Sequence, residues 1–151
     1  MYLVTLYLHS WLRYLVIGLG LWLLIAAARG KRRGEWSPSD ERLHVRFLAV
    51  LDTQFMLGLL LYFVLSPLTA AALSNMGAAM KDANLRYYGV EHIATMFLAV
   101  AAAHIGRVRS KRKSGAARHK TTLIAQVVWL VLTLLAIPWP FLDTGRPLFR
   151  F

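Results

Sequence analysis

Four long apolar segments, separated by polar and mostly basic stretches, restrict the folds open to this chain. We place them at residues 2–28, 43–65, 85–106 and 121–142. Each reaches the length of about 20 residues that a helix, rising about 1.5 Å per residue, needs to cross the apolar part of a bilayer. The chain has 151 residues, the size of one domain. The pattern predicts a single transmembrane domain, all-α, with four membrane-spanning helices.

The basic residues are concentrated in two of the three loops. "ARGKRRGEW" follows the first segment and "GRVRSKRKSGAARHK" follows the third, whereas "SPLTAAALSNMGAAMKDAN", after the second, holds one lysine. Positive charge gathers in short cytoplasmic loops of membrane proteins. We therefore predict an up-and-down bundle with both basic loops in the cytoplasm and both termini outside.

The formal net charge of +11 is explained by this topology and by attraction to anionic lipid at the basic loops. A nucleic-acid partner is not expected, because no base-stacking or base-reading element accompanies the charge. The chain has no cysteine, which excludes disulfides, thiolate metal sites and haem attached through C-x-x-C-H. The first segment has no basic start and no small-residue cleavage site, so we read it as a membrane span and not as a signal peptide.

Ionisable residues inside the predicted spans are the candidate functional residues. They are His9 and Arg13 in the first, Asp52 in the second, and Glu91 and His92 in the third. Such residues are costly in lipid and normally face the interior of a bundle. His9 and His92 each lie about seven residues into their spans, hence roughly 10 Å below the outer surface. We expect all five to form one polar layer in the outer half of the membrane, with Arg13 reaching toward Asp52.

Two histidines at equal depth on different helices suit axial ligation of a b haem. In this hypothesis His9 and His92 bind the iron, and Arg13 or Arg86 pairs with the haem carboxylates. Room for the group could come from small residues on matching helix faces, namely Gly20, Ala99 and Ala103. Close helix packing uses such residues equally well.

Other interpretations of the polar layer remain open. His9 and His92 could make hydrogen bonds between helices, or could bind a non-haem metal together with Asp52 or Glu91. Glu91 could instead accept protons from the outer side when an electron arrives. We expect Glu91 to face a neighbouring helix or a wet cleft, because it lies about 100° around the helix from His92.

The remaining three histidines lie near the cytoplasmic ends of the spans. His119 adjoins Arg118 and Lys120, so we expect it at the surface, and we expect interfacial packing for His44 and His104. His104 lies 12 residues after His92, about 120° around the helix. This offset disfavours two stacked haems.

Several stretches also resemble a family of short four-span bacterial membrane proteins that are often catalogued as cytochrome b. The matching stretches are "LHSWLRYLV", "QFMLGLLLYF", "AMKDANLRYYGVEHIATM" and "RHK". The resemblance implies a bacterial inner-membrane protein that carries a b haem and passes electrons to or from quinone or another complex. Its recurring polar positions correspond to His9, Arg13, Glu91, His92 and His119. The chain lacks the paired, evenly spaced histidines of the larger dihaem cytochromes b.

In a second hypothesis the protein has no chemistry of its own. The small size, the absence of extramembrane domains and the alanine-rich third segment also suit an accessory subunit of a larger membrane complex, or a homo-oligomer. An optical spectrum of the purified protein would separate this hypothesis from the haem hypothesis.

Overall fold

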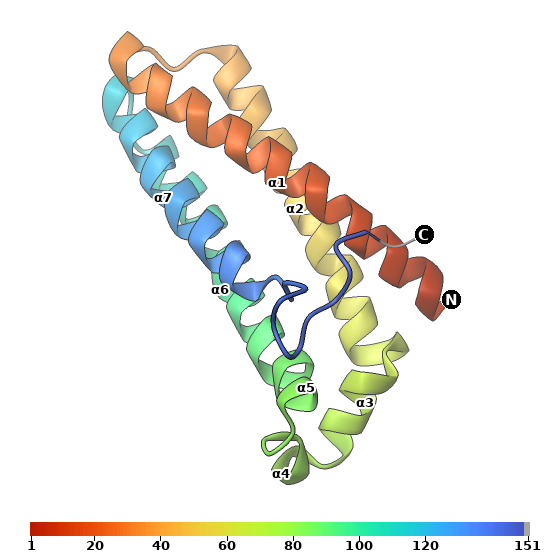
Figure 1. Ribbon diagram of the computed structural model, residues 1–151. Coiled ribbons are helices and arrows are strands. Elements are labelled where there is room, and N and C mark those ends of the chain that lie inside the picture. The colour runs from red at the N-terminus through yellow and green to blue at the C-terminus, as the bar shows by residue number, and fades with distance from the viewer. Residues whose placement is uncertain (150–151) are drawn as a thin grey trace.

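The computed structural model describes residues 1–149, and within this range the chain is helical without any β-strand (Figure 1). The helices, in chain order, are α1 (Tyr2–Arg33), α2 (Pro38–Leu60), η1 (Leu61–Leu65), α3 (Pro67–Ser74), α4 (Met76–Ala79), α5 (Ala83–Arg86), η2 (Tyr87–Glu91), α6 (His92–Lys111) and α7 (Gly115–Ala136). η1 and η2 are single turns of the wider π-helix that continue α2 and precede α6. The all-α prediction is confirmed.

Four helical stretches are long and apolar enough to cross a membrane, as predicted: Tyr2–Arg33, Pro38–Leu65, Ala83–Lys111 and Gly115–Ala136. The fourth is shorter than expected, because residues 137–142 are not helical. Ile137 is extended, and Pro138 and Pro140 lack the N–H groups that a further helical turn would use. Between the second and third stretches, α3 and α4 form two short helices around Asn75, whose side chain caps α4.

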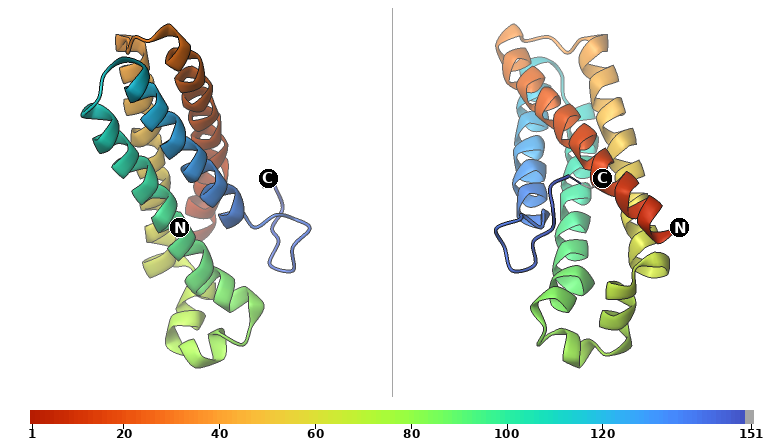
Figure 2. Two further views of the ribbon diagram at one scale, coloured as in Figure 1. Left: turned by 90° about the vertical axis from the view of Figure 1, so that its left-hand side faces the viewer. Right: turned by 45° about the vertical axis from the view of Figure 1, so that its right-hand side comes forward.

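The loop between α1 and α2 and the loop between α6 and α7 lie at the same end of the molecule, which we call the loop end (Figure 1). α3, α4 and α5 lie at the opposite end (Figures 1 and 2). α1 packs against α2 and α7, and α6 packs mainly against α7. Toward its N-terminus α1 diverges from α6 and α7, and the C-terminal segment crosses to it (Figure 1). There the Tyr14 hydroxyl donates to the carbonyl of Leu148, and its ring stacks on Phe149.

The core is a small buried cluster between the four long helices. It consists of Val16, Leu23, Leu43, Phe47, Leu51, Ala99, Ala103 and Trp129. Gly20 lies directly beneath the Trp129 ring, so that a Cβ at this position would collide with the indole. The small residues Gly20, Ala99 and Ala103 therefore allow close helix packing, and the idea that they open a cofactor slot was wrong.

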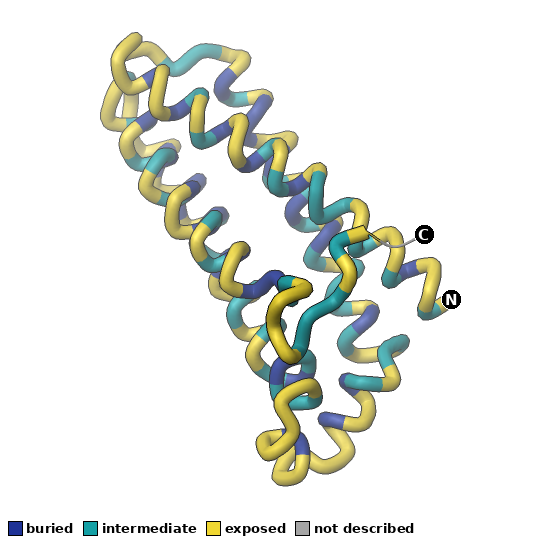
Figure 3. The backbone as a smooth tube through the Cα atoms, viewed as in Figure 1, coloured by how far each residue is buried: buried dark blue, intermediate teal, exposed yellow. Residues whose placement is uncertain are grey.

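Most of the outer surface of the long helices is exposed, as Figure 3 shows. Large apolar side chains cover this surface, including Leu15, Trp22, Phe63 and Leu135. In water such a surface would be unfavourable, but lipid tails are as apolar as these side chains. The surface composition agrees with the four membrane-length helices.

Candidate functional site

A cavity of about 330 Å³ lies in the half of the molecule remote from the loop end. Its walls come from α1, α2, η1, α3, η2, α6, the end of α7 and the C-terminal segment. His9, Arg13, His92 and Arg146 are among its lining residues, and we call it the histidine cavity. The structure thus brings together three of the five residues expected in the polar layer.

The His92 ring is held in one orientation by the end of α7. Its Nδ1 lies 2.8 Å from the backbone oxygen of Ala136, and because a carbonyl only accepts, Nδ1 carries the hydrogen. In the neutral ring Nε2 then keeps its lone pair. The Ala136 carbonyl is available because residue 140, the usual helical donor, is Pro140. The Tyr87 hydroxyl donates to the same oxygen at 2.7 Å.

His9 lies on α1 and packs against Gly58 of α2, where a Cβ would come within 3.1 Å of the ring carbon Cε1. The Gln54 side chain donates to the backbone carbonyl of His9 at 2.9 Å. Three buried atoms of residues lining the cavity have no hydrogen-bond partner in the described chain: His9 Nδ1, Gln54 Oε1 and Thr133 Oγ1. Buried polar atoms are nearly always paired in proteins, so these three favour a polar occupant.

The cavity is basic. Arg13 and Arg146 line it, and none of its described lining residues is Asp or Glu. Arg13 Nη2 donates to the Leu148 carbonyl and to the Tyr14 hydroxyl, both at 2.9 Å. Arg146 Nε donates to the Tyr88 hydroxyl at 3.0 Å. The sequence contains no local signal for Arg146, because it reaches the cavity only when the C-terminal segment folds back.

Asp52, Glu91 and Arg86 lie outside the histidine cavity, contrary to the expected layer. Asp52 pairs with His104 of α6, 2.7 Å from Oδ1 to Nε2. Glu91 pairs with Arg86 at 2.7 Å on the exposed side of η2. Within residues 1–149 no three His, Asp or Glu side chains converge as a metal site. The expected Arg13–Asp52 contact and the His9–His92–carboxylate metal set were therefore wrong.

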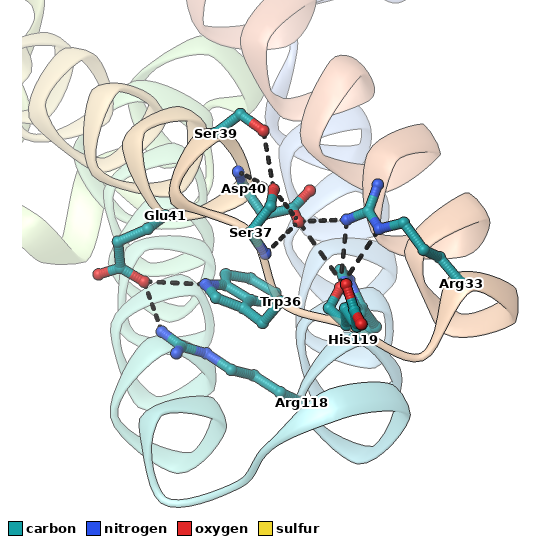
Figure 4. A network of polar contacts seen from close by, with 9 residues as sticks. Arg33, Trp36, Ser37, Ser39, Asp40, Glu41, Arg118 and His119 are labelled. Carbon is teal, nitrogen blue, oxygen red and sulfur yellow. Dashed lines mark hydrogen bonds and ion pairs between the residues drawn. The ribbon is translucent and has the colours of Figure 1, made fainter.

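The loop end holds a second polar cluster, shown in Figure 4. His119, expected at the surface, is fully buried there. Its Nε2 donates to the backbone oxygen of Glu35 at 2.7 Å, and its ring lies 4.8 Å from that of Trp36. Gly30 of α1 makes room for this ring, because a Cβ at that position would collide with the imidazole. His44 is buried nearby, 6.2 Å from Trp36 between ring centroids.

Glu41 joins the two loops in this loop-end network. Its carboxylate accepts hydrogen bonds from Trp36 Nε1 at 3.1 Å, from both terminal nitrogens of Arg107, and from Arg118. The Arg118 guanidinium also lies over the Trp36 ring, 4.2 Å from its centroid (Figure 4). The Glu41 carboxylate is thus paired with two guanidinium groups and one indole N–H, so the arrangement is suited to holding the loops together.

No protein-family model, curated protein or solved structure matches this chain. The histidine cavity is therefore the feature from which a function can be inferred.

Proposed function

We propose that this chain is a membrane electron-transfer protein that holds one b haem between His9 and His92. The observation that carries the proposal is that these imidazoles, from two different helices, line one cavity. The hydrogen bond from His92 Nδ1 to Ala136 supports it, because ligating histidines usually donate their other ring N–H to a carbonyl or carboxylate. A bound b haem supplies a one-electron couple.

The other cavity residues fit the same group. Arg13 and Arg146 provide two cations for the haem carboxylates, and no described lining residue offers a competing carboxylate. Arg146 thus replaces Arg86, which is paired with Glu91. Apolar side chains such as Val16, Phe55 and Met96 line the rest of the cavity and keep water from a ring between the helices.

We further propose that the four helices cross a bacterial inner membrane as an up-and-down bundle with both termini outside. The position of both basic loops at one end supports this orientation, since cytoplasmic loops collect Lys and Arg and attract anionic lipid (Figure 1). The histidine cavity then lies in the outer half of the membrane, where quinone or a partner complex would exchange electrons with it. The resemblance to short four-span bacterial proteins supports the choice of membrane.

The optical spectrum of protein purified from haem-replete cells tests the haem proposal. We expect a Soret band that shifts on reduction, and we expect His9→Ala or His92→Ala to abolish it. His104→Ala is the matched control, because His104 pairs with Asp52 outside the cavity and its loss should leave the band intact. A colourless wild-type preparation, or a band that survives both cavity variants, would exclude this assignment.

A second candidate function, an accessory subunit, is favoured by the Asp52–His104 pair. These side chains remain 48% and 44% exposed on the outside of α2 and α6, although Asp52 lies about midway along its span. Ionisable groups at such depth rarely face lipid, so a partner helix would shelter the pair. Extraction in mild detergent should then recover a stoichiometric complex that Asp52→Asn weakens. A protein that runs as a monomer, with no partner subunit or second copy, would contradict this function.

A further inference from the structure

One face of α7 carries buried polar side chains along nearly its whole length, which we call the α7 polar column. Its members follow each other at spacings of three and four residues, and they are His119, Thr122, Gln126, Trp129 and Thr133. Such spacing places side chains in line on one face of a helix. Each member is at most 4% exposed, and each has a side-chain nitrogen or oxygen without a hydrogen-bond partner in the described chain.

The neighbouring helices add similar atoms to the same interior. His44 Nδ1 and Gln54 Oε1 of α2 are buried without a partner, and so is His9 Nδ1 of α1. His44 and Gln54 share a face of α2 with Phe47, which contacts Trp129 edge-to-face at 4.8 Å. The unpartnered atoms thus lie on the inner sides of three of the long helices, α1, α2 and α7. Buried polar atoms are rarely left unpaired, so this concentration requires an explanation that single packing defects do not provide.

The dimensions of the column suit bridging water molecules. Neighbours three or four residues apart on a helix have Cβ atoms about 5–6 Å apart. One water that makes two hydrogen bonds of about 2.8 Å each spans the same distance. From His119 to Ala136 the helix rises about 26 Å, most of the thickness of about 30 Å of a bilayer core.

We propose that the α7 polar column holds a chain of bridging waters and conducts protons between the loop end and the histidine cavity. Each water accepts a proton from one neighbour and passes another to the next, so a proton enters at one end as one leaves at the other. Thr122, Gln126 and Thr133 suit this task, because hydroxyl and amide groups both donate and accept hydrogen bonds. They are also neutral, so no fixed charge traps the proton at mid-membrane.

The α7 polar column ends near two carboxylates at the loop end and at the histidine cavity at the other end. At the loop end His119 Nε2 lies 4.0 Å from Oδ2 of Asp40, and Glu41 follows in the next position of α2. At the other end Thr133 lines the histidine cavity. Protons would therefore reach the cavity from the loop end, and not through Glu91, which lies outside the cavity. This inference goes beyond the electron-transfer proposal and does not require a bound haem.

The test is proton flux into liposomes that contain the purified full-length chain and a trapped pH-sensitive dye, driven by a potassium diffusion potential. We expect wild-type flux well above that of protein-free liposomes, and at least a tenfold loss in Thr122→Val and in Gln126→Leu. Thr121→Val is the matched control, because the Thr121 hydroxyl donates to the Ala117 carbonyl at 3.0 Å and lies off the column. Wild-type flux no greater than that of empty liposomes, or full flux in Thr122→Val, would overturn the proposal.

A second measurement tests the waters themselves. Hydroxyl radicals generated from bound water by brief X-ray irradiation should label Trp129, although it is fully buried, and the Thr122→Val change should remove this label. The reference is Trp129 in Thr122→Val, because Phe47 packs against Trp129 and would meet the same waters. Trp129 labelling no higher in the wild type than in Thr122→Val would refute the inference. Thr122→Val is nearly isosteric, so it still tests the proton flux if Gln126→Leu does not fold. Wild-type flux without a Soret band would separate this inference from the haem proposal.

Discussion

Removing the charge of Glu41 should strongly destabilise the loop end. In Glu41→Gln the side chain keeps its size and can still accept from Trp36, but the two guanidinium groups lose their carboxylate. The Arg107 and Arg118 side chains are only 9% and 16% exposed, so water cannot replace the lost partner well. The substitution thus isolates the electrostatic contribution of this network.

The expected magnitude follows from the burial of the partners. Removing one member of a buried ion pair costs about 3–5 kcal/mol, because it leaves an uncompensated buried charge. Exposed pairs contribute about 0–1 kcal/mol. Glu41 itself is 36% exposed, which places this case between the two limits. We expect the free energy of unfolding to fall by about 2–3 kcal/mol.

Unfolding by SDS in mixed micelles, followed by far-UV circular dichroism, measures this difference. Glu35→Gln is the control, because Glu35 is exposed and joins the network through its backbone carbonyl. The control should lie within about 0.5 kcal/mol of wild type. If Glu41→Gln is equally stable, the network does not hold the loops together and the reasoning fails.

Three further predictions concern packing, capping and topology. Gly30→Ala should destabilise the protein by about 1–3 kcal/mol in the same assay, because the new methyl group overpacks the buried imidazole of His119. Gly18→Ala is the control: this glycine has open space around it, so the change should be neutral or stabilising by up to about 1 kcal/mol. Equal effects of the two substitutions would contradict the packing described. Ser37→Ala removes the capping box of α2 and should cost about 1 kcal/mol, and an unchanged midpoint would show that the cap is dispensable. Because the chain has no cysteine, Lys113→Cys and Phe141→Cys can each be labelled with a membrane-impermeant maleimide, and only the second should react from outside intact cells; the reverse pattern would invert the proposed orientation.

Much of the fold could be predicted from the sequence, because it depends on properties that act locally. The length of each apolar segment is set by bilayer thickness, and this was enough to predict four long helices. Depth along a helix follows from a fixed rise per residue, so His9 and His92 could be matched before any contact was known. The structure places both on the histidine cavity.

The rotation of each helix about its own axis was decided only by tertiary packing. It depends on where neighbouring helices can approach, and Gly20 under Trp129 and Gly30 beside His119 are two such places. These contacts bury His119, although its basic neighbours in the sequence had led to the prediction that it is exposed. For the same reason Asp52 faces His104 and not Arg13, although its depth allowed either partner.

The course of the C-terminal segment was also decided only by the tertiary structure. Local composition predicted a span that continued to residue 142. In the structure α7 ends at Ala136, because Pro138 and Pro140 lack the N–H groups that further helical turns would use. The released carbonyl of Ala136 then orients His92, and the chain beyond it folds back to place Arg146 on the cavity. Apolar content and segment length determine which stretches enter the membrane, whereas contacts between residues more than a hundred positions apart, such as Arg13 with Leu148, determine what the cavity contains.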